Sequence, residues 1–468
     1  GLEYIVDGCP LNNPDKDNSC PIGNPVYPGT GNKFATEIDA GIGERISFTR
    51  IYNSRRSETL GAFGAAWEGT WTHNYDKRLF EQARTAIHTV FLHRPNGDLY
   101  YFNVDSGQQI TNFGVHGELT RLPSDNWQFV TLDNLTENYN SSGRLTSTTD
   151  LHGNIHTLMY DAQNRLDRVE SNTGEHLQFG YDASDRISTV TDQAGRTWAY
   201  HYDASNNLEF VDNPDGTTKQ YHYEDINNLN ALTGITDERA IRYATYEYGI
   251  NGRMTASYHG PKTAVLTDRI QGISITYDGA NGTRVVTNSN GDPSTFSTPV
   301  QLGAALVTNI TGPGCSTCGT GESSFAYDTR NNLIGRSDSS GVTRFGNYDS
   351  HGQFGCKAEG LSPNDTTPNL GDCAYDSTAS PNARRTDYTY DSRFFNKITS
   401  IAEPSVFASD PTAQCTPGTD CKITTRSYDD YGNLLTETAS GYDTSGNAVT
   451  RTNTRNYGGD GSPGCDAV

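Results

Sequence analysis

The residues of this sequence that could carry out chemistry are first of all its nine cysteines, most of which occur as close pairs. Cys315 and Cys318 form a C-x-x-C within a Gly-rich stretch, which could serve a redox reaction or supply half of a zinc site. No βαβ pattern surrounds the motif, and the next cysteines are spaced unlike those of a zinc ribbon. We therefore expect structural disulfides between neighbouring cysteines, pairing Cys9–Cys20, Cys315–Cys318, Cys356–Cys373 and Cys415–Cys421.

The ninth cysteine, Cys465, has no local partner under this pairing. An odd cysteine in an oxidised chain is typical of a bond between two molecules. We therefore expect Cys465 to approach the Cys9/Cys20 segment of a neighbouring copy, in a head-to-tail assembly that forms a filament or a ring. The acidic, Tyr- and Gly-rich composition and the cysteine pairs favour a secreted protein over a reduced cytosolic one.

A possible cation site occurs between Cys9 and Cys20. Asp15, Asp17 and Ser19 follow the alternation with which a calcium loop begins. The segment lacks the Gly at position six and the Glu at position twelve of such a loop. A solvated turn is the favoured interpretation, with these three residues as the calcium candidate.

Nothing in the sequence predicts catalysis. Acidic residues are spread over the whole chain, so no single carboxylate pair stands out as a general acid and base. No serine lies in a G-x-S-x-G setting, and the 11 histidines are scattered. We expect a protein that is not an enzyme and that binds no cofactor or metal.

Composition and charge exclude further classes. Lys+Arg 35 against Asp+Glu 56 gives a formal net charge of -21, which opposes binding to nucleic acids or anionic membranes. No apolar run approaches the roughly 20 residues that span a bilayer. Only 33% of residues are hydrophobic, yet 10% are aromatic, including 27 Tyr. Because disordered chains are poor in aromatic residues, we expect an ordered chain of short strands and tight turns.

The element that organises these residues is a repeat marked by the dipeptide Tyr-Asp, which occurs 11 times where chance gives about 3. Tyr139, Tyr160, Tyr181, Tyr202 and Tyr223 follow one another at intervals of 21 residues. The repeat reads Y-D-x-x-[G/N]-[R/N]-L, and later copies begin at Tyr327, Tyr348 and Tyr428. We expect repeat turns at Tyr160-Asp161, Tyr181-Asp182, Tyr202-Asp203 and Tyr327-Asp328.

Each position of the repeat has a physical role. The residue four after the tyrosine is Gly, Asn or Asp, the types that tolerate a left-handed backbone. The aspartate can accept backbone N–H groups across the turn. The tyrosine therefore ends one strand, D-x-x-[G/N] turns the chain, and an apolar residue such as Leu166 begins the next strand.

Strand alternation fails directly after the turn, where Leu166 and Val169 are three residues apart. Either a bulge or a strand that is buried on both faces explains this spacing. Hairpins of equal length should stack side by side, because one hairpin is not stable alone. The predicted fold is all-β: one continuous antiparallel sheet of stacked hairpins.

The repeat resembles that of the RHS/YD-repeat family, which includes bacterial polymorphic-toxin shells, the B and C components of insecticidal ABC toxins, and animal teneurins. The segment from Ile22 to Phe80, with GNPVYPGTGNKF, ISFTRIYNS and GAFGAAWEGTWTHNYDKRL, is similar to the N-terminal RHS region. The resemblance implies a sheet coiled into a spiral shell or tube. The D-P-x-G-x-x-x-G autoproteolysis segment of toxin shells has no counterpart, and the chain is shorter than full shells, so we expect about one turn with open sheet edges.

These patterns divide the chain into four regions. We expect a Cys-bearing N-terminal segment (1–21), an RHS-type β region (22–136), regular 21-residue repeats (137–260) and degenerate repeats with Cys-rich insertions (261–468).

The function that follows is a non-enzymatic extracellular scaffold, secreted or at a bacterial cell surface, that associates with itself or with another shell chain. Two alternatives stay open. One is a cell-surface adhesin whose exposed aromatic rings bind polysaccharide. The other is the N-terminal part of a toxin-encapsulating shell that lacks its toxin domain.

Overall fold

The computed structural model describes most of the chain. The described residues are 5–6, 9–10, 22, 25–42, 46–55, 62–64, 70–83, 88–104, 110–112, 117–263, 269–279, 282–301, 304–313, 321–339, 341–404, 421–442 and 447–455.

One antiparallel sheet of 27 strands dominates the fold, and almost every strand in it pairs with its neighbours in sequence. Its strands, in spatial order, are β11 (Gly117–Arg121), β12 (Trp127–Thr131), β13 (Thr136–Tyr139), β14 (Leu145–Thr149), β15 (Ile155–Tyr160), β16 (Leu166–Ser171), β17 (His176–Tyr181), β18 (Ile187–Asp192), β19 (Thr197–Tyr202), β20 (Leu208–Asp212), β21 (Thr218–His222), β22 (Gly234–Thr236), β23 (Arg242–Tyr248), β24 (Met254–His259), β25 (Ile270–Asp278), β26 (Thr283–Asn288), β27 (Pro293–Ser297), β30 (Asn309–Thr311), β31 (Ser323–Tyr327), β32 (Leu333–Asp338), β33 (Gly341–Gly346), β34 (Cys356–Leu361), β35 (Arg384–Tyr390), β36 (Ile398–Pro404), β37 (Cys421–Tyr428), β38 (Leu434–Tyr442) and β39 (Ala448–Thr454). A short 3-10 helix, η1 (Pro123–Asp125), connects β11 to β12.

The strands before β11 form separate, smaller sheets. One four-stranded sheet holds β3 (Val26–Tyr27), β4 (Asn32–Ile42), β5 (Ile46–Asn53) and β6 (Thr70–His73). A second has the order β10 (Ile110–Asn112), β9 (Leu99–Val104), β8 (His88–His93) and β7 (Arg78–Ala83). Two-stranded sheets are made by β1 (Ile5–Val6) with β2 (Cys9–Pro10), and by β28 (Val300–Gln301) with β29 (Ala304–Ala305).

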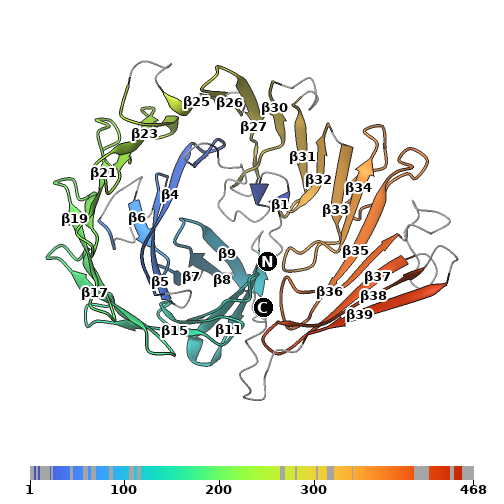
Figure 1. The fold of residues 1–468 in the computed structure, drawn as a ribbon, viewed down its shortest axis with the longest axis horizontal. Coiled ribbons are helices and arrows are strands. Elements are labelled where there is room, and N and C mark those ends of the chain that lie inside the picture. Colours follow the sequence, from blue (N-terminus) through green and yellow to red (C-terminus); the bar gives the residue numbers. More distant parts are fainter. Residues whose placement is uncertain are drawn as a thin grey trace.

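The large sheet curves around the two N-terminal sheets (Figure 1). Strands β11 to β31 form an arc, β4 to β9 lie inside it, and β35 to β39 spread away from the arc on the far side. Since β11 and β39 stand at the two ends of the strand order, the sheet is not closed into a barrel. The prediction of an all-β, continuous antiparallel sheet of coiled hairpins is confirmed. The continuous sheet begins only at Gly117, because the strands before it pack inside the spiral.

The broken alternation after each Tyr-Asp turn is a bulge. The pairing of β15 with β16 shifts register between Met159 and Tyr160, and the same shift recurs at Tyr181 and Tyr202. The extra residue lets the apolar residues six and nine after the tyrosine both face inward, as Leu166 and Val169 do.

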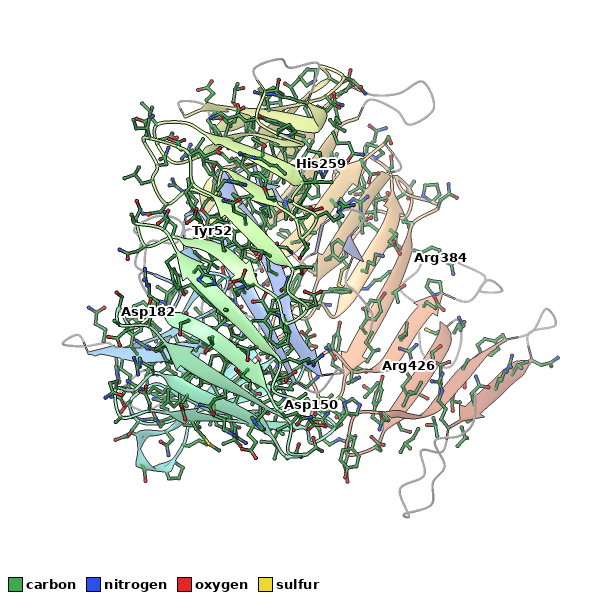
Figure 2. The ribbon with its side chains drawn as sticks, turned by 60° about the vertical axis from the view of Figure 1, so that its left-hand side comes forward. Tyr52, Asp150, Asp182, His259, Arg384 and Arg426 are labelled. Carbon is green, nitrogen blue, oxygen red and sulfur yellow. A yellow bond between two sulfur atoms is a disulfide. The ribbon has the colours of Figure 1, made fainter. Side chains whose placement is uncertain are left out.

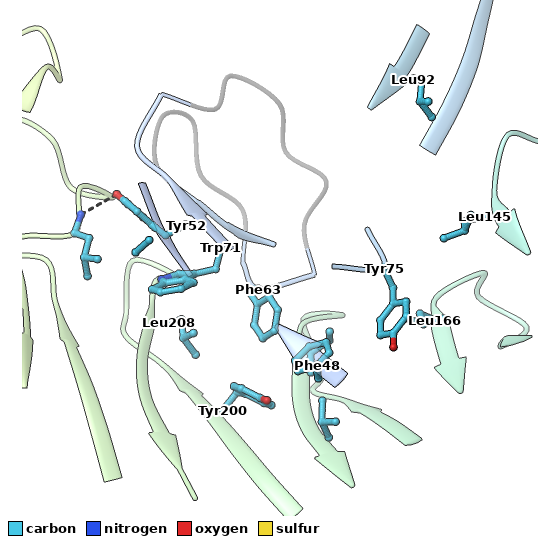
Figure 3. Close-up of a cluster of buried hydrophobic side chains, with 14 of the residues drawn as sticks. Phe48, Tyr52, Phe63, Trp71, Tyr75, Leu92, Leu145, Leu166, Tyr200 and Leu208 are labelled. Carbon is cyan, nitrogen blue, oxygen red and sulfur yellow. Dashed lines mark hydrogen bonds between the residues drawn. The ribbon is translucent and has the colours of Figure 1, made fainter. Parts of the chain in front are cut away.

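One large hydrophobic core joins the spiral to the sheets inside it (Figure 3). Phe48 of β5 is fully buried and its ring lies 5.4 Å from Phe179 and 6.4 Å from Tyr200 of the spiral. Trp71 of β6 lies 4.9 Å from Tyr221 in the same way. Aromatic rings therefore supply much of the buried area between the layers, which is how a chain with few aliphatic residues stays folded.

The contact between the layers predicts the effect of Phe48→Ala. Removal of this buried ring leaves a cavity between β5 and the spiral, and we expect a loss of about 3–5 kcal/mol in the free energy of unfolding. The loss is measured as a lower urea midpoint. Phe80→Ala, at a ring that is 39% exposed, is the control and should cost less than about 1.5 kcal/mol. Equal losses in the two variants would contradict this packing.

Candidate functional site: the Tyr-Asp turns and the seam of the spiral

The Tyr-Asp turns lie where neighbouring hairpins separate from each other. Between hairpins, β16 and β17 pair only over Arg168–Glu170, next to the alternate turn. At the other end, the Tyr181 hydroxyl crosses the opening and donates to the backbone oxygen of Leu166 at 2.7 Å. The tyrosine thus replaces a backbone hydrogen bond that the separated strands do not make.

This bond recurs around the spiral. In the repeats that make this bond, the tyrosine donates to the carbonyl that begins the second strand of the preceding hairpin, whereas Tyr139 donates to Glu137. The further pairs are Tyr160–Leu145, Tyr202–Ile187, Tyr277–Met254, Tyr348–Leu333 and Tyr428–Ile398. Burial raises the pKa of Tyr160 to about 12, so the hydroxyl keeps its proton and stays a donor at ordinary pH.

The aspartate of each turn holds the backbone. Asp182 Oδ1 accepts the amides of Ser184 and Arg186, at 2.9 and 3.0 Å, while its Oδ2 accepts the Arg186 guanidinium at 2.8 Å. Desolvation opposes the charge, but these hydrogen bonds hold the pKa of Asp182 below its usual range. Asp185 takes the left-handed conformation, with a φ of 63°. Figure 2 places Asp182 and Asp150, which caps an alternate turn, at opposite ends of the strands.

The arginine of the repeat links each turn to the next one. The Arg165 guanidinium lies 4.4 Å from the centre of the Tyr181 ring and forms an ion pair with Asp185 at 2.6 Å. Arg186 covers the Tyr202 ring at 4.1 Å in the next unit. Where asparagine takes this position, as at Asn207, its amide donates to the carbonyl of Leu229.

A buried ion pair attaches the inner sheet to the spiral. Arg50 of β5 donates to Asp39 of β4 at 2.5 and 2.8 Å, and its Nη2 also donates to the Tyr221 hydroxyl at 2.8 Å. Tyr200 donates to Asp39 at 2.9 Å. Burial opposes the charge, yet Asp39 keeps the pKa of Arg50 well above its usual value.

A second buried cluster surrounds Glu137 of β13. Its carboxylate, fully buried, accepts Lys77 and Arg94 at 2.5 Å each and the Tyr139 hydroxyl at 2.7 Å. Although desolvation opposes ionisation, Arg94 and Lys77 lower the pKa of Glu137 to about 2. The group is therefore a neutralised structural anchor and not a general acid.

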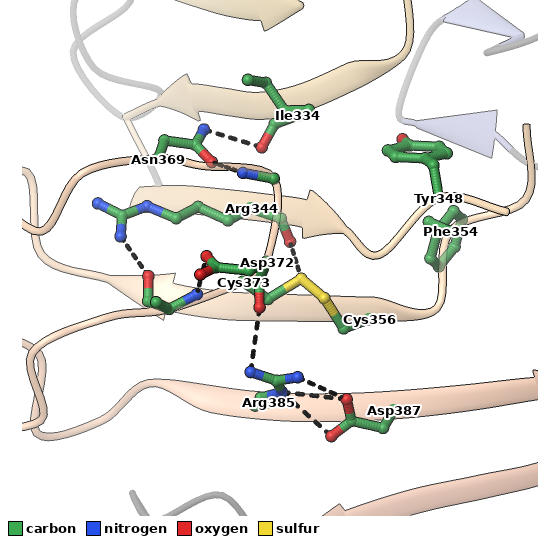
Figure 4. The surroundings of a disulfide bond; sticks show 12 residues. Ile334, Arg344, Tyr348, Phe354, Cys356, Asn369, Asp372, Cys373, Arg385 and Asp387 are labelled. Carbon is green, nitrogen blue, oxygen red and sulfur yellow. Dashed lines mark hydrogen bonds and ion pairs between the residues drawn. A yellow bond between two sulfur atoms is a disulfide. The ribbon is translucent and has the colours of Figure 1, made fainter. Parts of the chain in front are cut away.

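A disulfide attaches the segment between β34 and β35 to the later part of the sheet (Figure 4). Cys356 and Cys373 are bonded and fully buried, together with Ala358 and Leu361. Around them Arg344 donates to Ala374, and Arg385 donates to Asp372 at 3.1 Å. Cys421 is also disulfide-bonded. The group is a structural clamp.

The spiral has a seam where its second winding meets its first. Asn134 exchanges two hydrogen bonds of 2.7 Å with the backbone of Phe395, which is 261 residues further along the chain. The Phe395 ring lies 4.1 Å from His351, whose Nε2 is 3.8 Å from Glu118 of β11. A Tyr-Asp turn of the second winding thus rests on an alternate turn of the first.

Several predicted site residues lie outside the described part of the chain. They are Asp15, Asp17, Ser19, Cys20, Cys315, Cys318, Cys415 and Cys465, and nothing is described of the Cys9 side chain. Their proposed disulfides and the calcium candidate stay predictions. Within the described ranges, no three His, Cys, Asp or Glu side chains are grouped so as to hold a metal ion. No helix of that part is long and apolar enough to cross a membrane.

Sequence reasoning missed the buried ion pairs. Asp39, Arg50 and Glu137 are charged residues at inward-facing strand positions, a pattern that signals a buried partner. Glu137 stands two residues before Tyr139, on the same strand face. Lys77 and Arg94, the partners of Glu137, are 60 and 43 residues away in the chain, so spacing alone does not identify them.

The ladder of tyrosine bonds predicts the effect of Tyr181→Phe. The substitution leaves the ring in place and the Leu166 carbonyl without its donor, so we expect a loss of about 1 kcal/mol in the free energy of unfolding. Tyr202→Phe should cost a similar amount. Tyr431→Phe, at a side chain that is 56% exposed, is the matched control. If Tyr181→Phe or Tyr202→Phe were as stable as this control in urea, the role of the hydroxyl would be contradicted.

The Glu137 cluster predicts a dependence on pH. Because the folded pKa is lowered to about 2, its stabilising effect is complete above the unfolded value of about 4.3 and disappears as pH falls towards 2. Glu137→Gln leaves two buried cations uncompensated and should cost about 3–5 kcal/mol at pH 7. The difference from the unsubstituted protein, measured by urea unfolding, should shrink between pH 4 and about 2. A difference that stays constant over this range would contradict the assignment, and Glu322→Gln at an exposed site is the control.

Comparison with known proteins agrees with this geometry. Residues 23–102 match a domain of unknown function (DUF6531), and residues 83–267 match the teneurin YD-shell. No curated protein matches the chain.

Solved structures of toxin complexes show a distant likeness. The crystal structure of TcdB2-TccC3 without its hypervariable C-terminal region is 12% identical, with 97% of this chain and 27% of that chain covered and a TM-score of 0.38. A Tc holotoxin pore of Photorhabdus luminescens, carrying a TccC3 mutation, is 12% identical over 92% of this chain and 27% of that chain, with a TM-score of 0.37. This chain thus spans 27% of the length of these two solved chains.

The two family matches together run from residue 23 to residue 267 and overlap over residues 83–102, within strands that lie inside the spiral. They include the Tyr-Asp turns at Tyr160, Tyr181 and Tyr202, whose bonds hold neighbouring hairpins together. The chain belongs to the RHS/YD-repeat family.

Proposed function

We propose that this protein is a non-enzymatic extracellular scaffold, a segment of a shell wall that joins further shell strands at an open edge of its sheet. The proposal rests on the structural role of the charged and aromatic side chains. The Tyr-Asp turns and the Arg50 and Glu137 clusters are engaged in holding hairpins and layers together.

The oxidised cysteines support an extracellular site of action. The Cys356–Cys373 bond is fully buried in its own small cluster, so it belongs to the folded state. Disulfides of this kind persist in oxidising surroundings and are rare in the cytosol.

The last strand of the large sheet offers the edge for association. All seven side chains of β39 are exposed, and within the described residues β38 is its only partner strand. The Arg455 amide donates to Leu435, which sets the alternation of bonded pairs along β38 and β39. Thr450 and Thr452 then direct their backbone groups away from β38, towards a strand that could be added.

Substitution of Thr452 by proline tests this edge. Thr452→Pro removes an N–H that β38 does not use, so the fold should persist while strand addition is blocked. We expect the unsubstituted protein to associate with rising concentration in sedimentation velocity and the variant to stay monomeric. Arg451→Pro is the contrasting variant, since its N–H pairs with β38 and its loss should lower stability. A monomer at all concentrations in the unsubstituted protein would contradict self-association.

One observation favours a second candidate, binding of polysaccharide. Phe80 and Phe91 stack at 4.9 Å with their planes 13° apart, and Phe80 is 39% exposed. Exposed rings of this kind stack on sugars. Retention on immobilised polysaccharide that is lost in Phe80→Ala would support this candidate against the scaffold alone.

A further inference from the structure

A hollow of about 960 Å³ lies beside β11, the first strand of the large sheet. One wall consists of β11 and the following turn, from Gly117 to Asp125. Ser350 and His351 of the second winding also line the hollow, together with the apolar residues Phe102 and Ile110. Its volume lies at the upper end of the range of ligand-binding sites.

The hollow lies off the edge of β11 and not over one of its faces. Successive side chains of a strand point to opposite faces, and here Gly117 and Leu119 are buried while Glu118 and Thr120 are exposed. All four residues line the same hollow. Only a space beside the strand can contact both sets, so the hollow adjoins the edge opposite β12.

The register of β11 determines which backbone groups face the hollow. The Leu122 amide donates to Asn126 at 2.7 Å, so Leu122 and Asn126 form a bonded pair. Bonded and non-bonded pairs alternate in an antiparallel ladder, which makes Leu119–Phe129 and Gly117–Thr131 non-bonded pairs. The N–H and C=O groups of Gly117 and Leu119 therefore point away from β12. Among the described residues no strand pairs with this edge.

The charged groups that line the hollow are Glu118, Asp125, Arg121 and His351. Glu118 and Asp125 have side chains that are 56% and 71% exposed, and His351 Nε2 lies 3.8 Å from Glu118. Arg121 is paired with Asp125 at 2.8 Å. Backbone groups in strand geometry, the apolar residues Phe102 and Ile110, and the exposed Glu118 carboxylate select a strand with alternating apolar and basic residues.

We propose that the edge of β11 is a docking site for an extended basic peptide of another protein, which adds as a strand beside Gly117 and Leu119. Its main chain completes the hydrogen bonds of these two residues. Its apolar side chains lie on Phe102 and Ile110, and its basic side chains lie near Glu118. This docking site goes beyond the scaffold role and uses a different edge from β39.

The test uses the full chain with the Thr452→Pro substitution, so that association at β39 does not contribute. The probe is a fluorescent heptapeptide of alternating lysine and valine, and binding is followed by fluorescence anisotropy. We expect saturable binding that weakens at least tenfold when alternate amides of the peptide are N-methylated, because those N–H groups then cannot pair. Hydrogen exchange should show new protection at the amides of Gly117 and Leu119.

The charge of Glu118 gives an independent test. Glu118→Lys should weaken binding of the lysine peptide at least tenfold and create binding of the matching glutamate–valine peptide. Glu322→Lys, an equal charge change at a distant exposed site, should leave both affinities unchanged. The proposal is overturned by absence of binding, by equal binding of the N-methylated peptide, or by amides of Gly117 and Leu119 that are already protected in the free protein.

Discussion

The fold depends on one constraint, the need to satisfy backbone groups where neighbouring hairpins separate. Between hairpins, strands such as β16 and β17 pair only near the alternate turn. At the other end, backbone carbonyls such as that of Leu166 would lose their partners, at a cost of about 1–3 kcal/mol each if left buried. The repeat tyrosine supplies the missing donor and fills the opening with its ring. Tyrosine alone among the aromatic residues combines a flat ring with a terminal hydroxyl that reaches the next hairpin.

The other recurring residues of the repeat follow from this bond. The ring of Tyr181 faces the turn, and Arg165 covers it while pairing with Asp185, so an arginine of one unit orders the next. Aspartate suits this position because it accepts amides of its own turn and the arginine at the same time. Most of these bonds join adjacent units, so the body is stabilised by contacts between neighbours, as in other repeat proteins.

Whether the sequence predicts a contact depends on how far apart its two residues are along the chain. The turns, the hairpins and the antiparallel order could be predicted, because Tyr160, Asp161 and Leu166 lie within seven residues of one another. The bulge was one of two open interpretations, since Leu166 and Val169 show the spacing but not its cause. The ion pair from Lys219 to Glu37 spans 182 residues, and the bond from Arg50 to the Tyr221 hydroxyl spans 171. No local pattern records where β5 packs inside the arc, so the separate inner sheets could not be predicted.

The seam explains why the described strands form a spiral, with β11 and β39 at the two ends of the sheet, and not a barrel. A barrel would require β39 to meet β11 in one ladder. Instead, the turn at Phe395 rests on the turn at Asn134, so the second winding passes beside the first at the level of its turns. His351 and Ser350 of that winding line the hollow beside β11, and no described strand of that winding pairs with β11. The two ends of the sheet are thus separated by the winding itself, and a strand added at β39 leaves the edge of β11 unchanged.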